Sequence, residues 1–290
     1  MIKDLIKAMR PNQWIKNMFI FLPLVFGKKI FSYPENFKTG LAFIAFTCAS
    51  ASVYLLNDIL DIQADRAHPG KSLRPIASGR VSVPFAFIAA MLLALGAIAL
   101  SLVVDFYLGC VVIIYLLLNI LYSRILKHRV LVDVGCIGCF FLLRIAAGSV
   151  ASNVELSHWI IFLTALLALF LGFNKRRQEL QLSDEASAHR RVLLQYDHYF
   201  IDQMISVVTS SIVVVYMLYT VDPATISRFG TEHLIYSIPF VYYGIFRYLY
   251  LVHKIQVDGD PTKALLFDLR MQVNLFCWIT VCVTVIYFGL

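Results

Sequence analysis

The chain has 290 residues, of which 60% are hydrophobic and only 15% are charged, and its mean hydropathy is +0.76. Soluble domains are about half apolar and about a quarter charged, so this composition excludes a water-soluble fold and requires lipid around most of the surface. The net charge is +7. In a membrane protein this excess of Lys and Arg indicates cytoplasmic loops, anionic headgroups or anionic substrates, and we expect no nucleic acid partner.

The N-terminal segment lacks the features of a cleavable signal. It carries Lys3, Lys7 and Arg10 without an apolar core, which is typical of a short amphipathic helix on the membrane surface. The six cysteines all lie in apolar stretches. Cys136 and Cys139 form a C-x-x-C, but no second pair or nearby His completes a zinc set, so we interpret the cysteines as packing residues.

Apolar segments suited to crossing a bilayer follow one another along the whole chain. A spanning helix takes about 20 residues, and nine candidates cover approximately 15–32, 40–60, 82–104, 107–123, 130–151, 158–174, 203–222, 233–253 and 272–289. The first is the weakest, because Pro23 and Gly27 interrupt it. The sequence therefore predicts an all-α, polytopic membrane bundle of about nine helices, forming a single domain over residues 1–290.

Cations gather in alternate connections of this layout. The N-terminus and the loops after the second, fourth, sixth and eighth spans hold most of the Lys and Arg residues, with Lys28, Lys29 and Lys38 as exceptions. The positive-inside rule then places the N-terminus in the cytoplasm and the C-terminus outside. Nearly all clusters of polar residues share the cytoplasmic side, so we expect the site at the inner face of the cell membrane.

An acidic motif ends the second predicted span. It reads Asn57-Asp58-x-x-Asp61-x-x-x-Asp65, and on a helix the three acids would share one face. Carboxylates this close to lipid are costly, and a divalent cation resolves their repulsion. Mg²⁺ binds one or two carboxylates together with substrate phosphates. The motif therefore predicts a Mg²⁺ site on Asp58, Asp61 and Asp65 for a diphosphate leaving group, the alternative being a solvated acidic helix end.

A basic loop follows the acids directly. Carboxylates would hold the metal while Lys71 and Arg74 hold the spare phosphate oxygens. Ordinary positive-inside charge is the alternative, and for Arg80 it is as good an explanation as phosphate binding.

The acidic motif and the nine-span layout resemble the UbiA superfamily of intramembrane prenyltransferases over essentially the whole chain. The resemblance implies magnesium-dependent binding of a polyprenyl diphosphate and a second Asp-rich motif after the sixth span. Here that region reads Asn174-Lys175-Arg176-Arg177-Gln178-Glu179-Leu180, where cations replace acids. Cations bind anionic oxygen directly, which favours a site with more phosphate than one metal-bound diphosphate supplies.

The chain is similar to one branch of this superfamily, the decaprenyl-phosphate phosphoribosyltransferases. The matching segments are Arg10-Pro11-x-Gln13-Trp14-x-Lys16-Asn17, the three acids, Tyr122-Ser123-x-x-Leu126-Lys127, Arg144, Lys175-Arg176-Arg177-x-Glu179-Leu180, and Asp260-Pro261 with Leu265-Leu266 and Asp268. The resemblance implies Mg-dependent transfer of phosphoribose from phosphoribosyl diphosphate to a polyprenyl phosphate lipid, with release of diphosphate.

The phosphates of such a donor and acceptor predict several substrate-binding residues. They are Lys16, Asn17, Asn57, Lys71, Arg74, Tyr122, Lys127, Arg144, Lys175, Arg176 and Glu179. Arg144 is the most informative, because a guanidinium inside an apolar span needs a polar or anionic partner. The alternative is a structural ion pair with Asp133 or another buried acid. Asp133 itself would orient Lys127 or Arg144, or contact ribose hydroxyls. For Tyr122 the alternative is an interfacial aromatic.

Two other functions compete with this interpretation. A prenyltransferase for an aromatic or quinone precursor, or for haem, would share the fold and the metal but use a different donor. A transporter of phosphorylated lipids or anions would place polar residues along a path through the bilayer and often shows internal repeats, whereas here the polar residues gather at one side. The sequence also leaves a homo-oligomer open.

Overall fold

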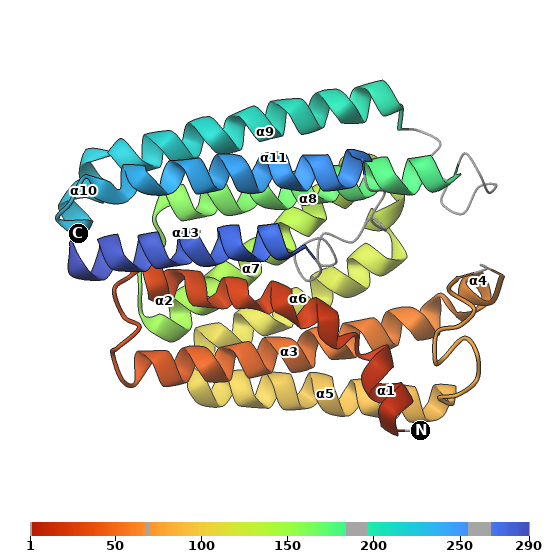
Figure 1. The fold of residues 1–290 in the computed structure, drawn as a ribbon. Coiled ribbons are helices and arrows are strands. Elements are labelled where there is room, and N and C mark those ends of the chain that lie inside the picture. Colours follow the sequence, from red (N-terminus) through yellow and green to blue (C-terminus); the bar gives the residue numbers. More distant parts are fainter. Residues whose placement is uncertain (1, 68–69, 184–195, 255–267, 290) are drawn as a thin grey trace. The chain divides into compact units, whose positions relative to one another are not determined.

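The computed structural model describes residues 2–67, 70–183, 196–254 and 268–289 (Figure 1). Over these ranges the regular structure is helical and includes no strand, which confirms the predicted all-α class. Seven helices among the described residues are long and apolar enough to cross a membrane. They are α3 (Glu35–Leu60), α5 (Val83–Val104), α6 (Phe106–Arg124), α7 (Val132–Ser152), α8 (His158–Ser183), α9 (His198–Val221) and α13 (Leu269–Phe288).

The other two predicted spans are each built from two pieces. After the short α1 (Ile2–Ala8), the first consists of a 3₁₀ helix η1 (Pro11–Phe21) and α2 (Leu22–Phe26). The eighth consists of η4 (His233–Ser237) and α11 (Ile238–Lys254). Proline stands at the start of η1 and of α2, where its missing N–H and fixed φ favour a new helix over continuation of the preceding one. The count of nine is therefore approximate.

The exposed surface of the long helices suits lipid. Only 17% of the most apolar window is buried in α5, and the same share in α13. Leu92 and Leu95 of α5 and Phe276 of α13 are among the exposed large side chains. Because water would penalise this much exposed apolar area, the chain is a multi-pass membrane protein.

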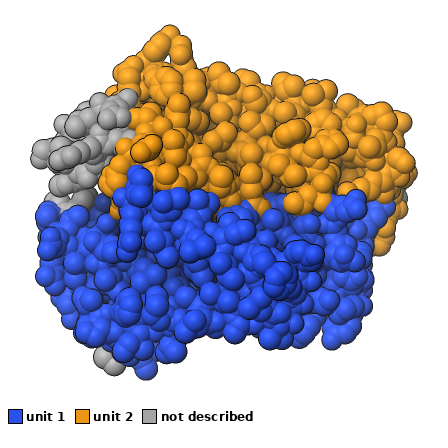
Figure 2. Space-filling view, turned by 180° about the vertical axis from the view of Figure 1, so that it is seen from behind, with its two compact units in different colours: residues 1–125, 143–155 blue, residues 126–142, 156–290 orange. Residues whose placement is uncertain are grey.

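The chain forms two compact units (Figure 2). Unit 1 comprises residues 1–125 and 143–155, and unit 2 comprises residues 126–142 and 156–290. Helix α7 therefore contributes its first half to unit 2 and its second half to unit 1. The single domain expected from the sequence stays a prediction.

In unit 1, α3 packs against α5, α6 and η1. Small side chains make this possible, because buried Ala42, Ala45 and Ala49 of α3 and Ala86 of α5 let helices approach closely. The second half of α7 also approaches η1 closely. A Cβ on Gly148 would lie 2.0 Å from the carbonyl oxygen of Ile20, so only glycine fits there.

In unit 2, α8 and α9 form the main packed pair, and α11 packs against α13 and α9. Phe170 of α8, Ile201 and Ile205 of α9 and Tyr248 of α11 share one buried apolar cluster. The shorter α10 (Pro223–Phe229) follows α9 and ends at Gly230, whose φ of 75° suits glycine. This packing fixes the start of α9 next to the second predicted motif on α8.

Candidate active site

The acidic motif lies across a helix break in unit 1. Helix α3 ends at Leu60, Asp61 is its C-cap residue, and α4 (Ile62–Ala67) begins directly afterwards. The spacing predicted that the three acids share one face of a single helix. In the structure they are divided between α3, its C-cap residue and α4. Backbone hydrogen bonds from Asp61 N to Asn57 O (2.9 Å) and from Asp65 N to Asp61 O (2.8 Å) nevertheless retain helical spacing.

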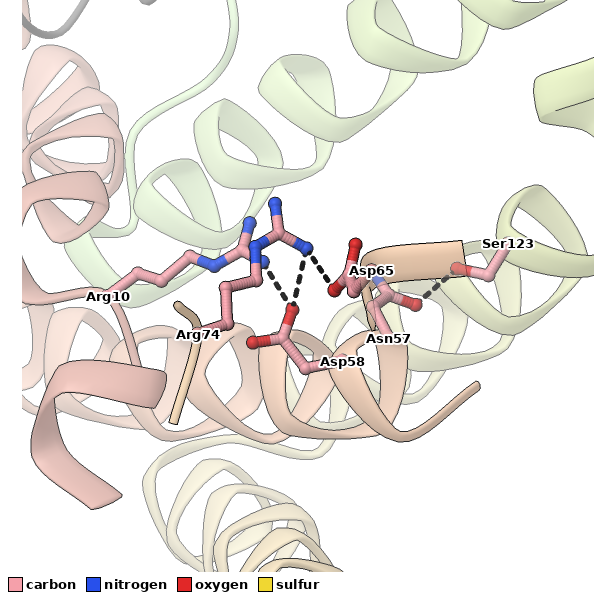
Figure 3. Close-up of polar contacts among 6 residues, drawn as sticks. All are labelled: Arg10, Asn57, Asp58, Asp65, Arg74 and Ser123. Atoms are coloured by element: carbon pink, nitrogen blue, oxygen red, sulfur yellow. Dashed lines mark hydrogen bonds and ion pairs between the residues drawn. The ribbon is translucent and has the colours of Figure 1, made fainter. Parts of the chain in front are cut away.

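Two of the acids are brought together by one arginine. Asp58 and Asp65 are buried, with 2% and 4% exposure, whereas Asp61 is only partly buried. The Arg74 Nη1 atom lies 3.2 Å from Asp58 Oδ1 and 2.6 Å from Asp65 Oδ2 (Figure 3). Carboxylates from two different helices thus converge on a single cationic group.

Arg10 is a second cation on the same carboxylate. Its Nη2 donates to Asp58 Oδ1 (Figure 3). Its guanidinium carbon lies 5.0 Å from the centroid of the Tyr54 ring. Arg10 precedes η1 with a φ of 55°, a left-handed conformation that is uncommon for this residue. Arg10 belongs to one of the matching sequence segments but was not predicted as a site residue. Its position directly before Pro11 at a membrane entry was the available signal.

Asn57 joins the end of α3 to the end of α6. Its Oδ1 accepts a hydrogen bond of 2.6 Å from Ser123 Oγ (Figure 3). Ser123 follows Tyr122, which is partly buried. The observed contact therefore gives Asn57 a positioning role, and substrate binding by Asn57 and Tyr122 stays a prediction.

Arg144 and Asn17, both predicted to bind substrate, contact each other inside unit 1. Arg144 is 5% exposed, and it donates from Nε to Asn17 Oδ1 (2.8 Å) and from Nη2 to Tyr115 Oη (3.2 Å). Asn17 is fully buried and donates to Thr47 Oγ1 (3.2 Å) and Ser50 Oγ (3.3 Å) of α3. These polar partners satisfy part of what a guanidinium in an apolar span requires.

The contacts of Arg144 and Asp58 are linked along α3. Thr47, Ser50, Tyr54 and Asp58 follow helical spacing, so they lie along one face. The eight residues from Ser50 to Asp58 correspond to about 12 Å along a helix. A polar face therefore runs from the acidic end of α3 into the membrane-spanning part of unit 1.

The second motif of unit 2 contains a buried ion pair. Arg176 and Asp133 are both 0% exposed, and Arg176 Nε lies 2.7 Å from Asp133 Oδ2. Arg176 also pairs with Glu179. Asp133, which was considered as an ion-pair partner of Arg144, thus pairs with Arg176. Because Arg176 already contacts two carboxylates, its predicted contact with phosphate would require this network to rearrange.

Tyr196 completes the network around Asp133. Its hydroxyl donates to Asp133 Oδ1 (2.8 Å) and accepts from the backbone N–H of Leu131 (2.8 Å). Burial raises the pKa of Tyr196, and the hydrogen bond to the Asp133 carboxylate raises it further, so the phenol stays protonated as a donor. The same motif presents Lys175 as an exposed side chain, and Arg177 Nε contacts Asp202 Oδ1 at 2.5 Å.

The remaining predicted residues lie on short elements. Lys16 is partly buried in η1, Lys71 is partly buried in the loop before α5, and Lys127 lies in the 3₁₀ turn η2 (Leu126–His128). Asp260, Pro261, Leu265 and Leu266, which were part of the resemblance, lie outside the described residues. The predicted substrate-binding role of the three lysines stays a prediction.

The carboxylates of Asp58 and Asp65 suit a hard cation but do not complete its coordination. Among the residues that the structure describes, no three His, Cys, Asp or Glu side chains are arranged to hold a metal ion together. The available ligands are carboxylate oxygens, which Mg²⁺ prefers, and Mg²⁺ commonly uses one or two of them beside water and phosphate. The residues therefore fit a Mg²⁺ ion whose remaining ligands come from a substrate.

The sequence profile of the UbiA prenyltransferase family matches residues 20–278. The chain belongs to this family. Decaprenyl-phosphate phosphoribosyltransferase of Mycolicibacterium smegmatis is 33% identical over 100% of this chain and 94% of the relative. The enzyme of the same name from Corynebacterium glutamicum is 32% identical over 98% of this chain and 86% of the relative.

Solved structures agree with the family assignment at the level of fold. A UbiA homolog from Archaeoglobus fulgidus bound to GPP and Mg²⁺ has a TM-score of 0.70 at 16% identity, covering 98% of this chain and 99% of that chain. A structure of digeranylgeranylglyceryl phosphate synthase has a TM-score of 0.67, also at 16% identity, covering 98% of this chain and 97% of that chain. The predicted UbiA-like fold is therefore confirmed.

Proposed function

We propose that this UbiA family member is a membrane phosphoribosyltransferase that transfers phosphoribose from phosphoribosyl diphosphate to a polyprenyl phosphate and releases diphosphate. The observation that carries the proposal is the convergence of two arginines on the buried carboxylates of Asp58 and Asp65. Such a group combines ligands for a metal with cations for phosphate oxygens. The named relatives, similar over nearly their full length, support the choice of donor and acceptor.

Magnesium is part of this proposal. Asp58, Asp61 and Asp65 would hold Mg²⁺, which supplies positive charge to the departing diphosphate when bound. Asp61 lies between the two buried acids in sequence and is partly buried at the junction of α3 and α4. A metal-holding role for Asp61 therefore requires its carboxylate to join the other two.

The side chains of the protein provide positioning and charge rather than a nucleophile. The bond from the anomeric carbon of ribose to the diphosphate oxygen breaks, and a bond from that carbon to an oxygen of the lipid phosphate forms. The lipid phosphate is already ionised at neutral pH, so no protein base has to remove a proton from it. Arg10, Lys71 and Arg74 would bind oxygens of the diphosphate and stabilise the charge that develops as it leaves.

The other predicted residues would bind the remaining phosphates and the ribose. In this proposal Asn17 and Arg144, which contact the polar face of α3 or each other, would bind substrate. Lys16 in the middle of η1 and Tyr122 near the end of α6 would do the same. Lys175, Arg176 and Glu179 of the second motif, together with Lys127 of η2, would supply further charges. We further propose that the protein lies in the cell membrane with its N-terminus and its site on the cytoplasmic side. This arrangement is compatible with a homo-oligomer.

An assay with purified full-length protein in detergent tests the proposal. With labelled phosphoribosyl diphosphate, polyprenyl phosphate and Mg²⁺, the label should move to the lipid fraction. A second reaction replaces the donor with a prenyl diphosphate and the acceptor with an aromatic acid, and we expect no product from it. Prenyl transfer without phosphoribosyl transfer would establish the competing prenyltransferase function, which the family fold also permits. Product formation of either kind excludes a pure transporter.

A further inference from the structure

We infer that Arg74 makes the binding of a divalent cation depend on the binding of diphosphate, so that the two enter the site together. This inference rests on the proposed function for the identity of the diphosphate-bearing donor. It assigns Arg74 a second role, beyond contact with phosphate, as the group that holds the two metal-binding carboxylates until a replacement anion arrives.

The geometry at Arg74 carries the inference. One nitrogen, Nη1, lies within hydrogen-bonding distance of both Asp58 Oδ1 and Asp65 Oδ2. These are the oxygens that a metal ion between the two carboxylates would need. A dication and a guanidinium at the same point would repel each other strongly in a poorly solvated environment. Metal binding to these oxygens therefore competes with Arg74.

The surroundings of Arg74 allow its side chain to leave the two carboxylates by rotation, without movement of the main chain. Its backbone N–H donates to Lys71 O (2.9 Å) and its carbonyl accepts from Ser78 N (2.9 Å), while the adjacent Pro75 is buried. The main chain is thus held, whereas the side chain, with 29% exposure, has a route toward solvent. The two carboxylates themselves are almost fully buried, so they have little access to water as a substitute partner.

A diphosphate removes the penalty of releasing Arg74. Guanidinium groups form strong, charge-assisted and often bidentate hydrogen bonds with phosphate oxygens. If a metal ion bound the two carboxylates, a diphosphate bound together with it would offer Arg74 a new anionic partner. A metal ion without diphosphate would displace Arg74 without giving it a new anionic partner. Diphosphate without a metal ion would be repelled by the two carboxylates, which carry the same sign of charge. Binding of the two should therefore be strongly cooperative.

Metal binding by full-length protein in detergent tests the inference without any turnover. Mn²⁺ replaces Mg²⁺ and is titrated by electron paramagnetic resonance in the absence of phosphates. The wild type should bind Mn²⁺ weakly. Arg74→Gln should bind it at least about tenfold more tightly, because the charged hydrogen bonds from Arg74 to Asp58 and Asp65 no longer oppose the ion, while Arg10 still contacts Asp58. Arg74→Lys keeps the charge but not the planar fork and should fall between the two.

A second titration follows retention of labelled inorganic diphosphate by the protein at fixed Mn²⁺. In the wild type Mn²⁺ should increase diphosphate retention markedly, whereas in Arg74→Gln this increase should be much smaller. Arg80→Gln is the matched control, because Arg80 lies in the same loop but pairs with Asp4 (3.1 Å). It should behave like the wild type in both titrations.

The outcomes separate the inference from a merely structural role for Arg74. If Arg74→Gln and Arg74→Lys bind Mn²⁺ no more tightly than the wild type and Arg80→Gln, the inference is overturned. Should Arg74→Gln fail to fold, Arg74→Lys carries the comparison alone. If the coupling is found but no phosphoribose reaches the lipid, the inference stands and the proposed function fails.

Discussion

Arg74 reaches back nine residues to Asp65 and sixteen residues to Asp58, and its Nη1 contacts both carboxylates. Two residues on separate helices are thereby held at one point next to Arg10. This relationship turns an acidic sequence motif into a compact, charge-balanced group, and the predictions for activity follow from it.

Replacing either buried acid should abolish activity while leaving the fold intact. Asp58→Asn and Asp65→Asn each remove the charge needed to hold a metal and its diphosphate, so we expect phosphoribosyl transfer to fall by at least about a hundredfold. Initial rates with saturating substrates provide the measurement. Asp4→Asn alters an acid that pairs with exposed Arg80 and should keep nearly full activity. Equal losses in all three variants would argue against a special role for the buried pair.

The partly buried acid at the helix junction should behave like the other two. Asp61→Ala is expected to stop diphosphate release, because the metal would lose a ligand that the observed pair cannot replace. Diphosphate production can be followed with a coupled enzyme, and thermal unfolding in detergent checks the fold. Wild-type turnover by this variant would remove Asp61 from the metal site.

The buried pair in unit 2 should matter for stability in a characteristic way. Arg176→Gln or Asp133→Asn alone leaves one buried charge without its counterpart, which typically costs about 3–5 kcal/mol. The double variant removes both charges and should recover much of that loss. Thermal unfolding of the four proteins in detergent gives the comparison. Additive losses in the double variant would mean that the two side chains act independently.

Tyr196 should contribute to the same network through its hydroxyl. Tyr196→Phe removes a donor to Asp133 and an acceptor for the Leu131 N–H, and we expect a destabilisation of about 1–3 kcal/mol. The raised pKa of Tyr196 means that its hydroxyl remains protonated well above neutral pH. The stability difference between wild type and variant should accordingly be flat between pH 6 and 8, to within about 0.5 kcal/mol. A difference that changes steeply in this range would contradict a neutral phenol.

The close approach of α7 to η1 predicts opposite outcomes for two glycines on one helix. Gly148→Ala would place a Cβ 2.0 Å from Ile20 O, so the variant should unfold at a lower temperature and lose activity. Gly135→Ala meets no atom within 4 Å and should be neutral or slightly stabilising, because alanine favours helix. Melting temperatures of the two variants in the same detergent decide the matter.

Hydropathy predicted most of the fold because the long apolar helices are local features. Pro23 and Gly27 already marked the first span as interrupted, but hydropathy did not show that it divides into η1 and α2. The site was harder to predict. The acids were visible in sequence, but their pairing with Arg10 and Arg74 depends on tertiary contacts.

The second motif illustrates the same limit. The sequence shows three consecutive cations after the sixth span, and two of them, Lys175 and Arg176, were predicted to bind phosphate. The structure buries Arg176 against Asp133, which is 43 residues earlier by number, and leaves Lys175 exposed. No local pattern distinguishes these two neighbours, because their different environments come from how α7 and α8 pack within unit 2.

Mass spectrometry of the lipid product tests the proposed transfer most directly. Purified wild-type protein, phosphoribosyl diphosphate, polyprenyl phosphate and Mg²⁺ should yield a lipid heavier by one phosphoribosyl group, together with one diphosphate per lipid. Omitting Mg²⁺ by chelation should stop both products. Diphosphate release without the heavier lipid, or an unchanged lipid beside a consumed prenyl diphosphate, would contradict phosphoribosyl transfer as the function of this chain.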